Sequence, residues 1–401
     1  MSLTLLLDLD DTLLDLNMDE FIPVYFKAFS NFLANLVKPE DMIPALKEGT
    51  HYMMSSTDPG YTLQEKFDSI FFPKLGIPKE KLQPQIDRFY DDVFPSLSYI
   101  TSPRPKAVSF IEWAFEQGYS LAISTNPVFP LKAIHHRMRW AGLPPEKYHF
   151  ITVSAYERYH FTKPHPAYFA EVLGNMGWPD APILMVGDDV ERDLTGSASL
   201  GLPVFWINKS NIDYPAGQRY KQRGSIGDVR PWLEATDLSA LEPEFSTTDS
   251  LLGLMLASPA SLQGLLSPVP QALLRERPIA DEWSLTEILC HLRDTEREIN
   301  LSRIRLILNH DEPFIAARNT DLWAVERAYN EKDAGEMLSE FLSARMETLE
   351  ILLALSQQDW GRNARHAIFG PTDLLELVKF MAEHDRLHIR QFWSTIKQLE
   401  K

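Results

Sequence analysis

The 401-residue chain contains a single cysteine, Cys290, which excludes a disulfide within the chain and a metal site built from several thiolates. Basic residues are also scarce, with 39 Lys and Arg against 56 Asp and Glu, a formal net charge of -17. Such a chain would repel phosphate backbones and anionic lipids over most of its surface, so we expect neither nucleic acid nor a membrane as a partner. The single thiol fits a reducing cytosol, and we expect a cytoplasmic protein.

Long hydrophobic runs are missing as well, since no stretch reaches the roughly 18 apolar residues of a membrane span. The N-terminal apolar run ends at Asp8 and lacks the basic flank and small-residue cleavage site of a signal peptide. Hydrophobic residues still make up 44% of the chain, which is enough for buried cores. At roughly 100–200 residues per domain, the length predicts two or three domains.

Short apolar runs in the first half of the chain predict buried strands, because each is bounded by Gly, Pro or acidic residues and followed by a helical pattern. Uninterrupted runs of this length suit a parallel sheet covered on both faces, and the alternation of strand and helix predicts an α/β sheet. In such sheets, ligands bind at the carboxyl ends of the strands. The predicted strands are 3–10, 119–125, 182–189 and 203–208.

A long, largely helical insertion, about residues 15–103, separates the first two predicted strands. It predicts a small helical cap over the edge of the sheet, with hinges near 15–17 and 102–105. A lid of this kind excludes water and selects the leaving group of a reaction. The helical patterns within it are 18–37, 39–56, 62–75 and 79–93.

The second half of the chain has a different pattern. A polar, turn-rich segment at 236–247 predicts a linker, and from Leu251 onward no strand pattern of any strength is found. Four segments carry helical periodicity, which predicts an antiparallel four-helix bundle. We therefore place an α/β domain at 1–235 and an all-α bundle at 248–401. The helical segments are 249–266, 284–309, 334–356 and 372–400.

Acidic residues crowd the end of the first predicted strand, in the order Asp8-Leu9-Asp10-Asp11-Thr12. A solvated turn could hold such a cluster, but Mg²⁺ would also bind there, because it prefers oxygen ligands and uses one or two carboxylates with phosphate and water. A carboxylate freed from solvent can attack phosphorus, which suggests Asp8. A second acid two residues on, Asp10, can protonate the leaving group and then activate water.

Three further segments stand where this chemistry needs them. Thr125 and Asn126 end the second strand and can hold a phosphoryl oxygen. Lys163 lies between strands and can neutralise charge, and Asp188 with Asp193 follows a later strand and can supply metal ligands. Taken singly, each segment is as typical of a helix cap, a surface charge or a turn. Their order along the chain favours a phosphoryl-transfer site.

Four segments in this order resemble the motifs of the haloacid dehalogenase-like hydrolases: DLDDTL at 8–13, ISTN at 123–126, KP at 163–164 and GDDVERD at 187–193. The resemblance covers about residues 1–235 and implies a Rossmann-like core with a helical cap and a Mg²⁺ cofactor. It implies hydrolysis of a small phosphorylated substrate rather than dehalogenation, because the dehalogenase branch lacks the second aspartate, here Asp10.

Residue by residue, the resemblance makes Asp8 the nucleophile and Asp10 the general acid and base, with Asp10 bound to the ion through its backbone carbonyl. Thr125 and Asn126 would contact the phosphoryl group, and Lys163 would stabilise its charge. The implied Mg²⁺ ligands are Asp8, Asp10 and Asp188, with Asp189 and Asp193 as auxiliary ligands or supports.

Three histidines in the second half form another candidate site. His384 and His388 are four residues apart on one predicted helix and therefore share a face. His291 lies on the apolar stripe of another helix. Three neutral imidazoles with open positions would suit Zn²⁺, Ni²⁺ or Fe²⁺. The residues alone leave hydrogen-bonded core histidines as the alternative.

The segments ADEWSLTEILCHLRDTE at 280–296 and HAIFGPTDLLELVKFMAEHDRLHIRQF at 366–392 resemble the DinB-like metal-binding four-helix bundles, including their YfiT-type members. That resemblance covers about residues 248–400 and implies that His291, His384 and His388 bind one metal ion, with His366 structural. Members of the family include thiol-dependent transferases and hydrolases. Two alternatives stay open: the bundle carries the main metal-dependent activity, or it is a non-catalytic sensor or homodimerisation module.

Overall fold

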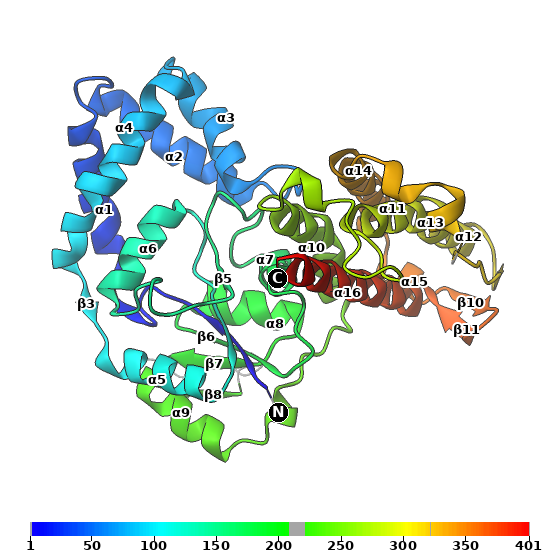
Figure 1. Ribbon diagram of the computed structural model, residues 1–401. Helices are drawn as coiled ribbons and strands as arrows, with labels where there is room; N and C mark the ends of the chain where they lie inside the picture. Colours follow the sequence, from blue (N-terminus) through cyan, green and yellow to red (C-terminus); the bar gives the residue numbers. More distant parts are fainter. Residues whose placement is uncertain (1, 208–220, 321, 401) are drawn as a thin grey trace. The chain divides into compact units, whose positions relative to one another are not determined.

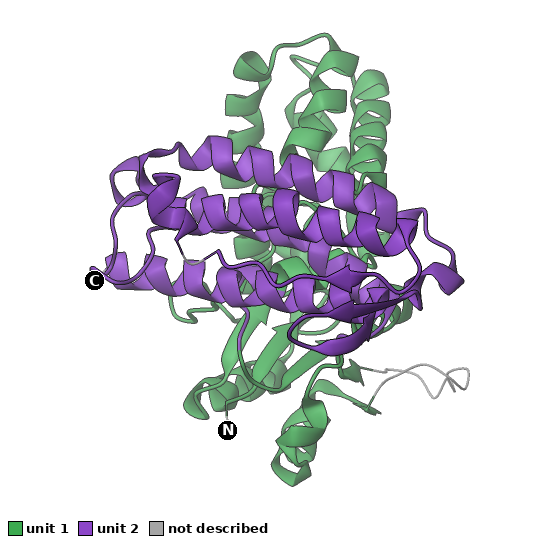
Figure 2. Cartoon of the chain, turned by 90° about the vertical axis from the view of Figure 1, so that its right-hand side faces the viewer, with its two compact units in different colours: residues 1–172, 180–244 green, residues 173–179, 245–401 purple. Residues whose placement is uncertain are grey.

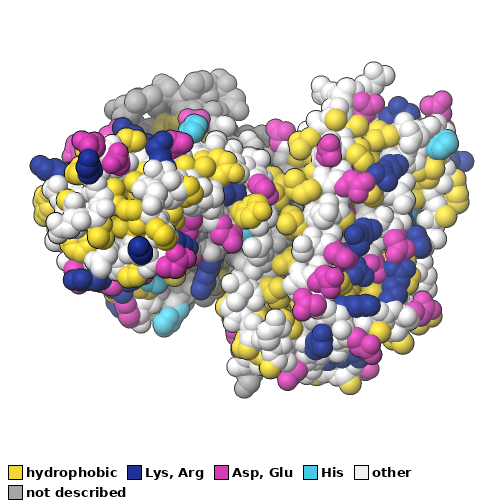
Figure 3. All heavy atoms as spheres, turned by 90° about the horizontal axis from the view of Figure 1, so that it is seen from above, with side chains coloured by type: hydrophobic (Ala, Val, Ile, Leu, Met, Phe, Trp, Pro, Cys, Tyr) yellow, Lys and Arg dark blue, Asp and Glu magenta, His cyan; other side chains and the backbone are white. Residues whose placement is uncertain are grey.

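A computed structural model describes residues 2–207, 221–320 and 322–400. The chain divides into two compact units, Met1–Val172 with Asp180–Glu244 and Leu173–Pro179 with Phe245–Lys401 (Figure 2). None of the described helices is long and apolar enough to cross a membrane. On the face shown in Figure 3, Lys and Arg side chains are interspersed with Asp and Glu and do not gather into a basic patch.

The first unit is built on a six-stranded parallel sheet of order β5-β4-β1-β6-β7-β8 (Figure 1). Every residue of the central strand β1 is buried, which explains the run of three leucines that follows Thr4. The predicted strands are confirmed, although Asn208 lies outside the described residues. The patterns missed β5 and β8, which have only two and three residues. The strands are β1 Thr4–Leu7, β4 Ser120–Ile123, β5 Thr152–Val153, β6 Ile183–Gly187, β7 Val204–Ile207 and β8 Gln222–Gly224.

Helices flank this sheet and connect its strands. The α9 helix begins with a capping box, in which Ser225 and Asp228 satisfy each other's backbone N–H groups. The helices are α5 Pro105–Glu116, α6 Leu131–Trp140, α7 Pro166–Asn175, α8 Gly196–Leu200 and α9 Ile226–Ala235, with the π-helical η2 Val190–Thr195 before α8 and the 3₁₀ segment η3 Leu238–Leu241 after α9.

The predicted cap is present as four helices between β1 and β4. Thr62 and Glu65 form a capping box at the start of α3, and Gly76 ends that helix in the left-handed region with φ 63°. A two-stranded pair, β2 with β3, joins the two ends of the cap. The elements are β2 Leu14–Asp15, α1 Met18–Phe32, α2 Pro39–Ser55, α3 Leu63–Leu75, α4 Lys79–Asp92, η1 Phe94–Ile100 and β3 Ser102–Pro103.

The second unit contains the four-helix bundle that the periodicity predicts. Its second helical segment is interrupted by one π-helical turn, η5, so that the predicted helix 284–309 appears as α11, η5 and α12. The main elements are α10 Thr248–Leu266, α11 Leu285–Thr295, η5 Glu296–Asn300, α12 Leu301–Asn309, α14 Ala334–Leu353 and α16 Leu374–Leu399. Shorter segments are η4 Gln271–Leu273, α13 Trp323–Glu326, η6 Tyr329–Glu331 and α15 Gln357–Trp360.

The expectation of no strand after Leu251 is wrong. A small sheet of order β11-β10-β9 forms from β9 Phe314–Ile315, β10 Asn363–His366 and β11 Gly370–Asp373. These strands have two to four residues and include Asn, Gly, Pro and Asp, so they carry neither an apolar run nor a clear alternation. Pairing rather than local preference makes them strands: β10 and β11 form a hairpin, and β9, about fifty residues earlier in the chain, pairs with β10.

A buried ion cluster ties the bundle together. Arg345 of α14 donates to Glu296 of η5 at 2.8 Å and to Asp385 of α16 at 2.5 Å. Its Nη1 also donates to the backbone oxygen of Met255 in α10, at 3.0 Å. All three charged side chains are buried. One guanidinium therefore links all four helical segments of the bundle.

Candidate functional site

The carboxyl ends of three neighbouring strands meet at one edge of the sheet. The strand β1 lies between β4 and β6, with Leu7 beside Ile123 on one side and Val186 on the other. The pairing continues one residue further, since the N–H of Asp8 donates to the oxygen of Val186 at 3.0 Å. This register places the residues that follow each strand next to one another, as expected for a ligand site in an open parallel sheet.

Three carboxylates converge there. Asp8, Asp188 and Asp193 each offer one oxygen, and these oxygens all lie within 4.8 Å of one another. Asp193 reaches the cluster from η2 and packs against Gly187 at the end of β6. A Cβ atom at position 187 would lie only 2.4 Å from the Cγ of Asp193. Glycine at 187 is thus required by close packing against this carboxylate. The donor set is all oxygen and strongly anionic, which fits a hard divalent cation such as Mg²⁺.

Lys163 supplies the positive charge inside this cluster. Its Nζ lies 2.8 Å from Asp8 Oδ1 and 2.5 Å from Asp193 Oδ1, and the side chain is buried. Burial by itself would lower the pKa of Lys163, but the carboxylates of Asp193 and Asp8 more than offset this and raise it. Burial raises the pKa of Asp193 to about 7, with Lys163 opposing the shift. Lys163 is therefore a cation at every pH at which the protein would work.

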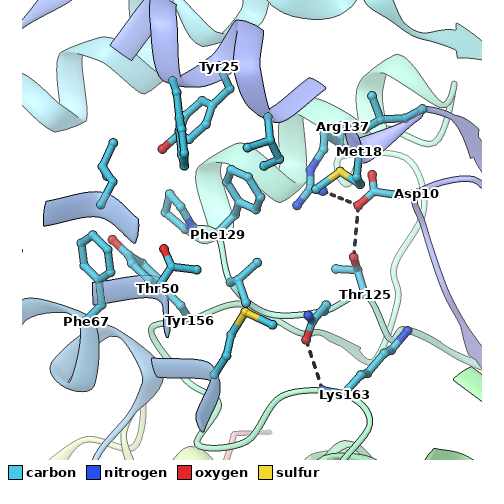
Figure 4. A pocket seen from close by; sticks show the side chains of 18 of the residues that line it. Asp10, Met18, Tyr25, Thr50, Phe67, Thr125, Phe129, Arg137, Tyr156 and Lys163 are labelled. Carbon is cyan, nitrogen blue, oxygen red and sulfur yellow. Dashed lines mark hydrogen bonds and ion pairs between the residues drawn. The ribbon is translucent and has the colours of Figure 1, made fainter. Parts of the chain in front are cut away.

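Asp10 does not join the three-carboxylate cluster. Its side chain forms an ion pair with Arg137 of α6, and Thr125 Oγ1 lies 3.5 Å from Asp10 Oδ2 (Figure 4). Burial raises the pKa of Asp10, while Arg137 works in the opposite direction. A raised pKa favours a carboxyl group that can hold and release a proton near neutral pH, as a general acid requires.

Arg137 is the site residue that the sequence patterns missed. It is only 1% exposed, and its Nε and Nη2 have no hydrogen-bond partner among the described residues. Its guanidinium carbon lies 4.7 Å from the centre of the Phe129 ring. In the segment HHRMRW, an arginine resembles any other solvated helix charge. Only its contact with Asp10 shows that it belongs to the site.

Two further predicted residues line the cavity and also bond to the backbone around it. Asn126 Oδ1 accepts a hydrogen bond from the N–H of Lys163 at 3.1 Å, which holds the lysine loop against the end of β4. Asp189 caps η2 by accepting from the N–H groups of Glu191 and Arg192 at 3.0 and 2.8 Å. The structure does not bring the Asp189 carboxylate into the cluster formed by the other acids.

These polar groups form one end of a cavity of about 700 Å³ within the first unit. The strand ends supply Asp10 and Thr125 and the loop before α7 supplies Lys163, whereas aromatic side chains such as Tyr25 and Phe67 line the opposite side (Figure 4). The volume is within the usual range for small-molecule sites. The predicted catalytic residues thus share one cavity with the helices of the cap.

The three predicted histidines also come together, in the second unit. The Nε2 atoms of His291 on α11 and His384 on α16 are 3.1 Å apart, and His388 lies within the same 4.8 Å cluster. Burial lowers the pKa of His291 and of His384 to about 3, and their imidazole neighbours add to the effect. The rings are therefore neutral near pH 7, the state in which imidazole binds a transition metal.

Neighbouring side chains orient these rings. His388 Nδ1 lies 2.8 Å from Gln391 Oε1, and the Trp283 ring stacks on His388 at a centroid distance of 6.0 Å. Such outer contacts set the direction in which a ligand nitrogen points. Cys290 is buried one residue before His291, and burial raises the pKa of its thiol to about 12. The thiol is therefore part of the core and has no role in this site.

Comparison with known proteins agrees with both halves of this description. Residues 3–201 match the family model of haloacid dehalogenase-like hydrolases, and residues 255–392 match that of the DinB superfamily. An uncharacterised Bacillus subtilis protein, YuaE, is 23% identical over 139 residues, 32% of this chain and 86% of that protein. A phosphoserine phosphatase of Thermus thermophilus is 30% identical over 105 residues, 26% of this chain and 40% of the phosphatase. Among solved structures, YfiT from Bacillus subtilis, with an unusual four-helix bundle topology, is 17% identical with a TM-score of 0.36, covering 40% of this chain and 93% of YfiT.

Proposed function

We propose that this chain, which combines a haloacid dehalogenase-like hydrolase domain with a DinB-like domain, is a Mg²⁺-dependent phosphohydrolase acting on a phosphate monoester. One observation carries the proposal. Three carboxylates and a buried lysine converge at the strand ends, and a fourth carboxyl group, that of Asp10, stands apart from them with a raised pKa. The nucleophile, Asp8, and the proton donor, Asp10, thus stand in different electrostatic environments, and a difference of this kind is what gives two carboxyl groups separate roles in one site. The single cysteine fits a cytosolic location for this activity.

The residues divide the reaction into two steps. Mg²⁺ bound by Asp8, Asp188 and Asp193 would neutralise charge on the phosphoryl oxygens. In the first step an Asp8 oxygen forms a bond to phosphorus, the bond from phosphorus to the ester oxygen breaks, and Asp10 gives its proton to that oxygen. In the second step Asp10 takes a proton from water as the water oxygen attacks phosphorus. Inorganic phosphate leaves, and the Asp8 carboxylate is restored.

Replacing Asp10 by Asn should slow turnover about 100-fold and make the phosphorylated enzyme accumulate, because an amide can neither protonate the leaving oxygen nor activate water. An aryl phosphate with an acidic phenol needs no proton in the first step. It should therefore release one equivalent of phenol in a rapid burst and leave Asp8 phosphorylated, which mass spectrometry of the quenched protein can detect.

Asp68→Asn is a suitable control, because Asp68 also lines the cavity but lies on the cap and pairs with Lys79 at 2.6 Å. This variant should show steady turnover without a burst. An Asp10→Asn variant that turned over at the wild-type rate, with no phosphorylated Asp8, would exclude Asp10 from both steps.

We further propose that the bundle holds one transition-metal ion through His291, His384 and His388. Replacing His384 by Ala should weaken Zn²⁺ or Ni²⁺ binding at least about 100-fold in calorimetric titration, since one of three protein ligands is lost. His366→Ala is the matched control, because His366 is buried on β10 outside the cluster and should leave the affinity within about threefold. Equal affinities of wild type and His384→Ala would exclude this site.

His384→Ala, compared with Asp8→Asn, separates this proposal from the alternative in which the bundle carries the main activity. If the bundle only binds metal, His384→Ala keeps the phosphatase activity and Asp8→Asn loses it. If the bundle catalyses the main reaction, His384→Ala loses turnover of the physiological substrate and Asp8→Asn keeps it. Both variants are therefore to be assayed on the same substrate set.

A further inference from the structure

The part of the cavity that faces away from the strand ends is apolar. All four helices of the cap contribute apolar side chains to it, among them Phe26 of α1, Leu46 of α2, Phe67 of α3 and Ile86 of α4. Phe129, which follows β4, adds another ring and also contacts the Arg137 guanidinium. Because these side chains come from separate elements and surround one space, the cap builds an apolar chamber (Figure 4).

Six polar side chains of the cap helices line the cavity, those of Asp19, Tyr25, Thr50, Asp68, Gln83 and Tyr90, and four of them are already bonded, Gln83 to Asp87 at 2.8 Å. The hydroxyls of Tyr25 and Tyr90 bond each other at 2.8 Å, and Asp68 is paired with Lys79. All residues of the cap are described, and none of those lining the cavity is Lys or Arg. A second phosphate lying among the cap residues would find no cation, because the cationic residues that line the cavity, Arg137, Lys163 and Arg192, belong to α6, the loop before α7 and η2. A sugar would leave several hydroxyls buried without partners, which costs binding free energy.

The chemistry of the proposed reaction directs the leaving group into this chamber. In phosphoryl transfer, the attacking and leaving oxygens lie roughly in line on opposite sides of phosphorus. Asp8 attacks from the strand ends, so the ester oxygen and the group attached to it lie on the side of the cavity formed by the cap. The surface that contacts the leaving group is therefore the apolar one.

We propose that the substrate is the phosphate monoester of a bulky, uncharged apolar alcohol, preferably an aromatic one, whose apolar body fills the chamber. This inference rests on the proposed phosphatase function and names the class of its leaving group. Flat rings suit a chamber lined by Phe and Tyr, because offset and edge-to-face contacts between rings add to the burial of apolar surface.

The test uses two esters whose alcohols have similar acidity, naphthylethyl phosphate and ethyl phosphate, with the full-length protein and Mg²⁺. Burying the aromatic group should raise kcat/KM for naphthylethyl phosphate by about 10- to 100-fold over ethyl phosphate. Equal kcat/KM values, with turnover that depends on Asp8, would overturn the substrate class and leave the phosphatase function standing. Hydrolysis of neither ester, nor of other monoesters, would overturn the phosphatase function.

Binding of the product alcohol tests the chamber without turnover. Naphthylethanol should bind the wild-type protein in a calorimetric titration, and ethanol should not. Absence of naphthylethanol binding would overturn the inference whether or not the protein is a phosphatase.

Two variants locate the effect. Phe67→Ala should lower the ratio of kcat/KM for the two esters about fivefold, because one wall of the chamber is lost. Phe32→Ala is the control: Phe32 is equally half-buried in the cap and contacts Phe89, but does not line the cavity, so the ratio should be unchanged. If circular dichroism shows that Phe67→Ala is unfolded, Thr50→Trp fills the chamber instead and should lower kcat/KM for naphthylethyl phosphate. An unchanged ratio in folded Phe67→Ala, or in Thr50→Trp, would contradict the proposal.

Discussion

Replacing Asp8 by Asn is expected to lower Mg²⁺-dependent phosphate release by at least about 10,000-fold, because the amide can neither attack phosphorus nor donate a charged oxygen to the cation. The substitution keeps the size of the side chain and removes one charge. Asp8 lies in a cluster of three carboxylates balanced by Lys163, so the loss of one negative charge leaves the fold intact. The measurement is release of inorganic phosphate at saturating substrate, with circular dichroism to check folding.

Asp11→Asn is the matched control for this prediction. Asp11 lies three residues further along the same loop, has φ 61° and pairs with Arg104 at 3.2 Å. Asparagine is among the residues that tolerate this left-handed backbone, so the loop should keep its shape. Turnover within about threefold of wild type is expected. If Asp8→Asn and Asp11→Asn had the same turnover, the assignment of Asp8 as nucleophile would be wrong.

The second large effect concerns stability. Replacing Arg345 by Met should lower the free energy of unfolding of the bundle by about 3–5 kcal/mol, because Glu296 and Asp385 would remain buried without a counter-charge. Hydrogen exchange of amides in α10, α11, α14 and α16 reports on this unit separately from the sheet. These amides should exchange faster in the variant, and to a similar extent in all four helices, since Arg345 contacts a residue from each of the other three segments.

Two controls identify the cause. Arg305→Met removes a cation from an exposed pair with Glu347, where both side chains are about half exposed, and should cost less than about 1 kcal/mol. Adding Glu296→Gln and Asp385→Asn to Arg345→Met removes the unpaired charges and should recover at least half of the lost stability. No recovery would mean that packing of the arginine stem, rather than charge, stabilises the bundle.

Much of the fold could be predicted from local patterns. The strands β1, β4, β6 and β7 are almost entirely buried and are therefore apolar except at Thr4 and Ser120, and the long helices repeat apolar residues at helical spacing. The short strands β9, β10 and β11 could not be predicted in this way. Their pairing depends on segments up to about fifty residues apart, and their own residues have no strong preference for strands.

The candidate sites show the same division. Asp8, Thr125 and Asp188 could be predicted to meet, because each lies within two residues of the end of a strand in a parallel sheet. Arg137 could not. It lies two residues from the exposed Arg139 on α6, and residues two apart on a helix point in different directions. The packing of α6 on the sheet decides which of these two arginines lies next to Asp10.

The amino-acid sequence by itself determined the two-part architecture, the acids at the strand ends and the three histidines of the bundle, because apolar runs, helical periodicity and the order of motifs can be read along the chain. Only the tertiary structure decided that Asp10 pairs with Arg137, that Asp189 caps a helix, and that the cap surrounds an apolar chamber. Each of these depends on side chains from separate elements meeting in space, and that meeting is set by packing rather than by the residues nearby in the chain.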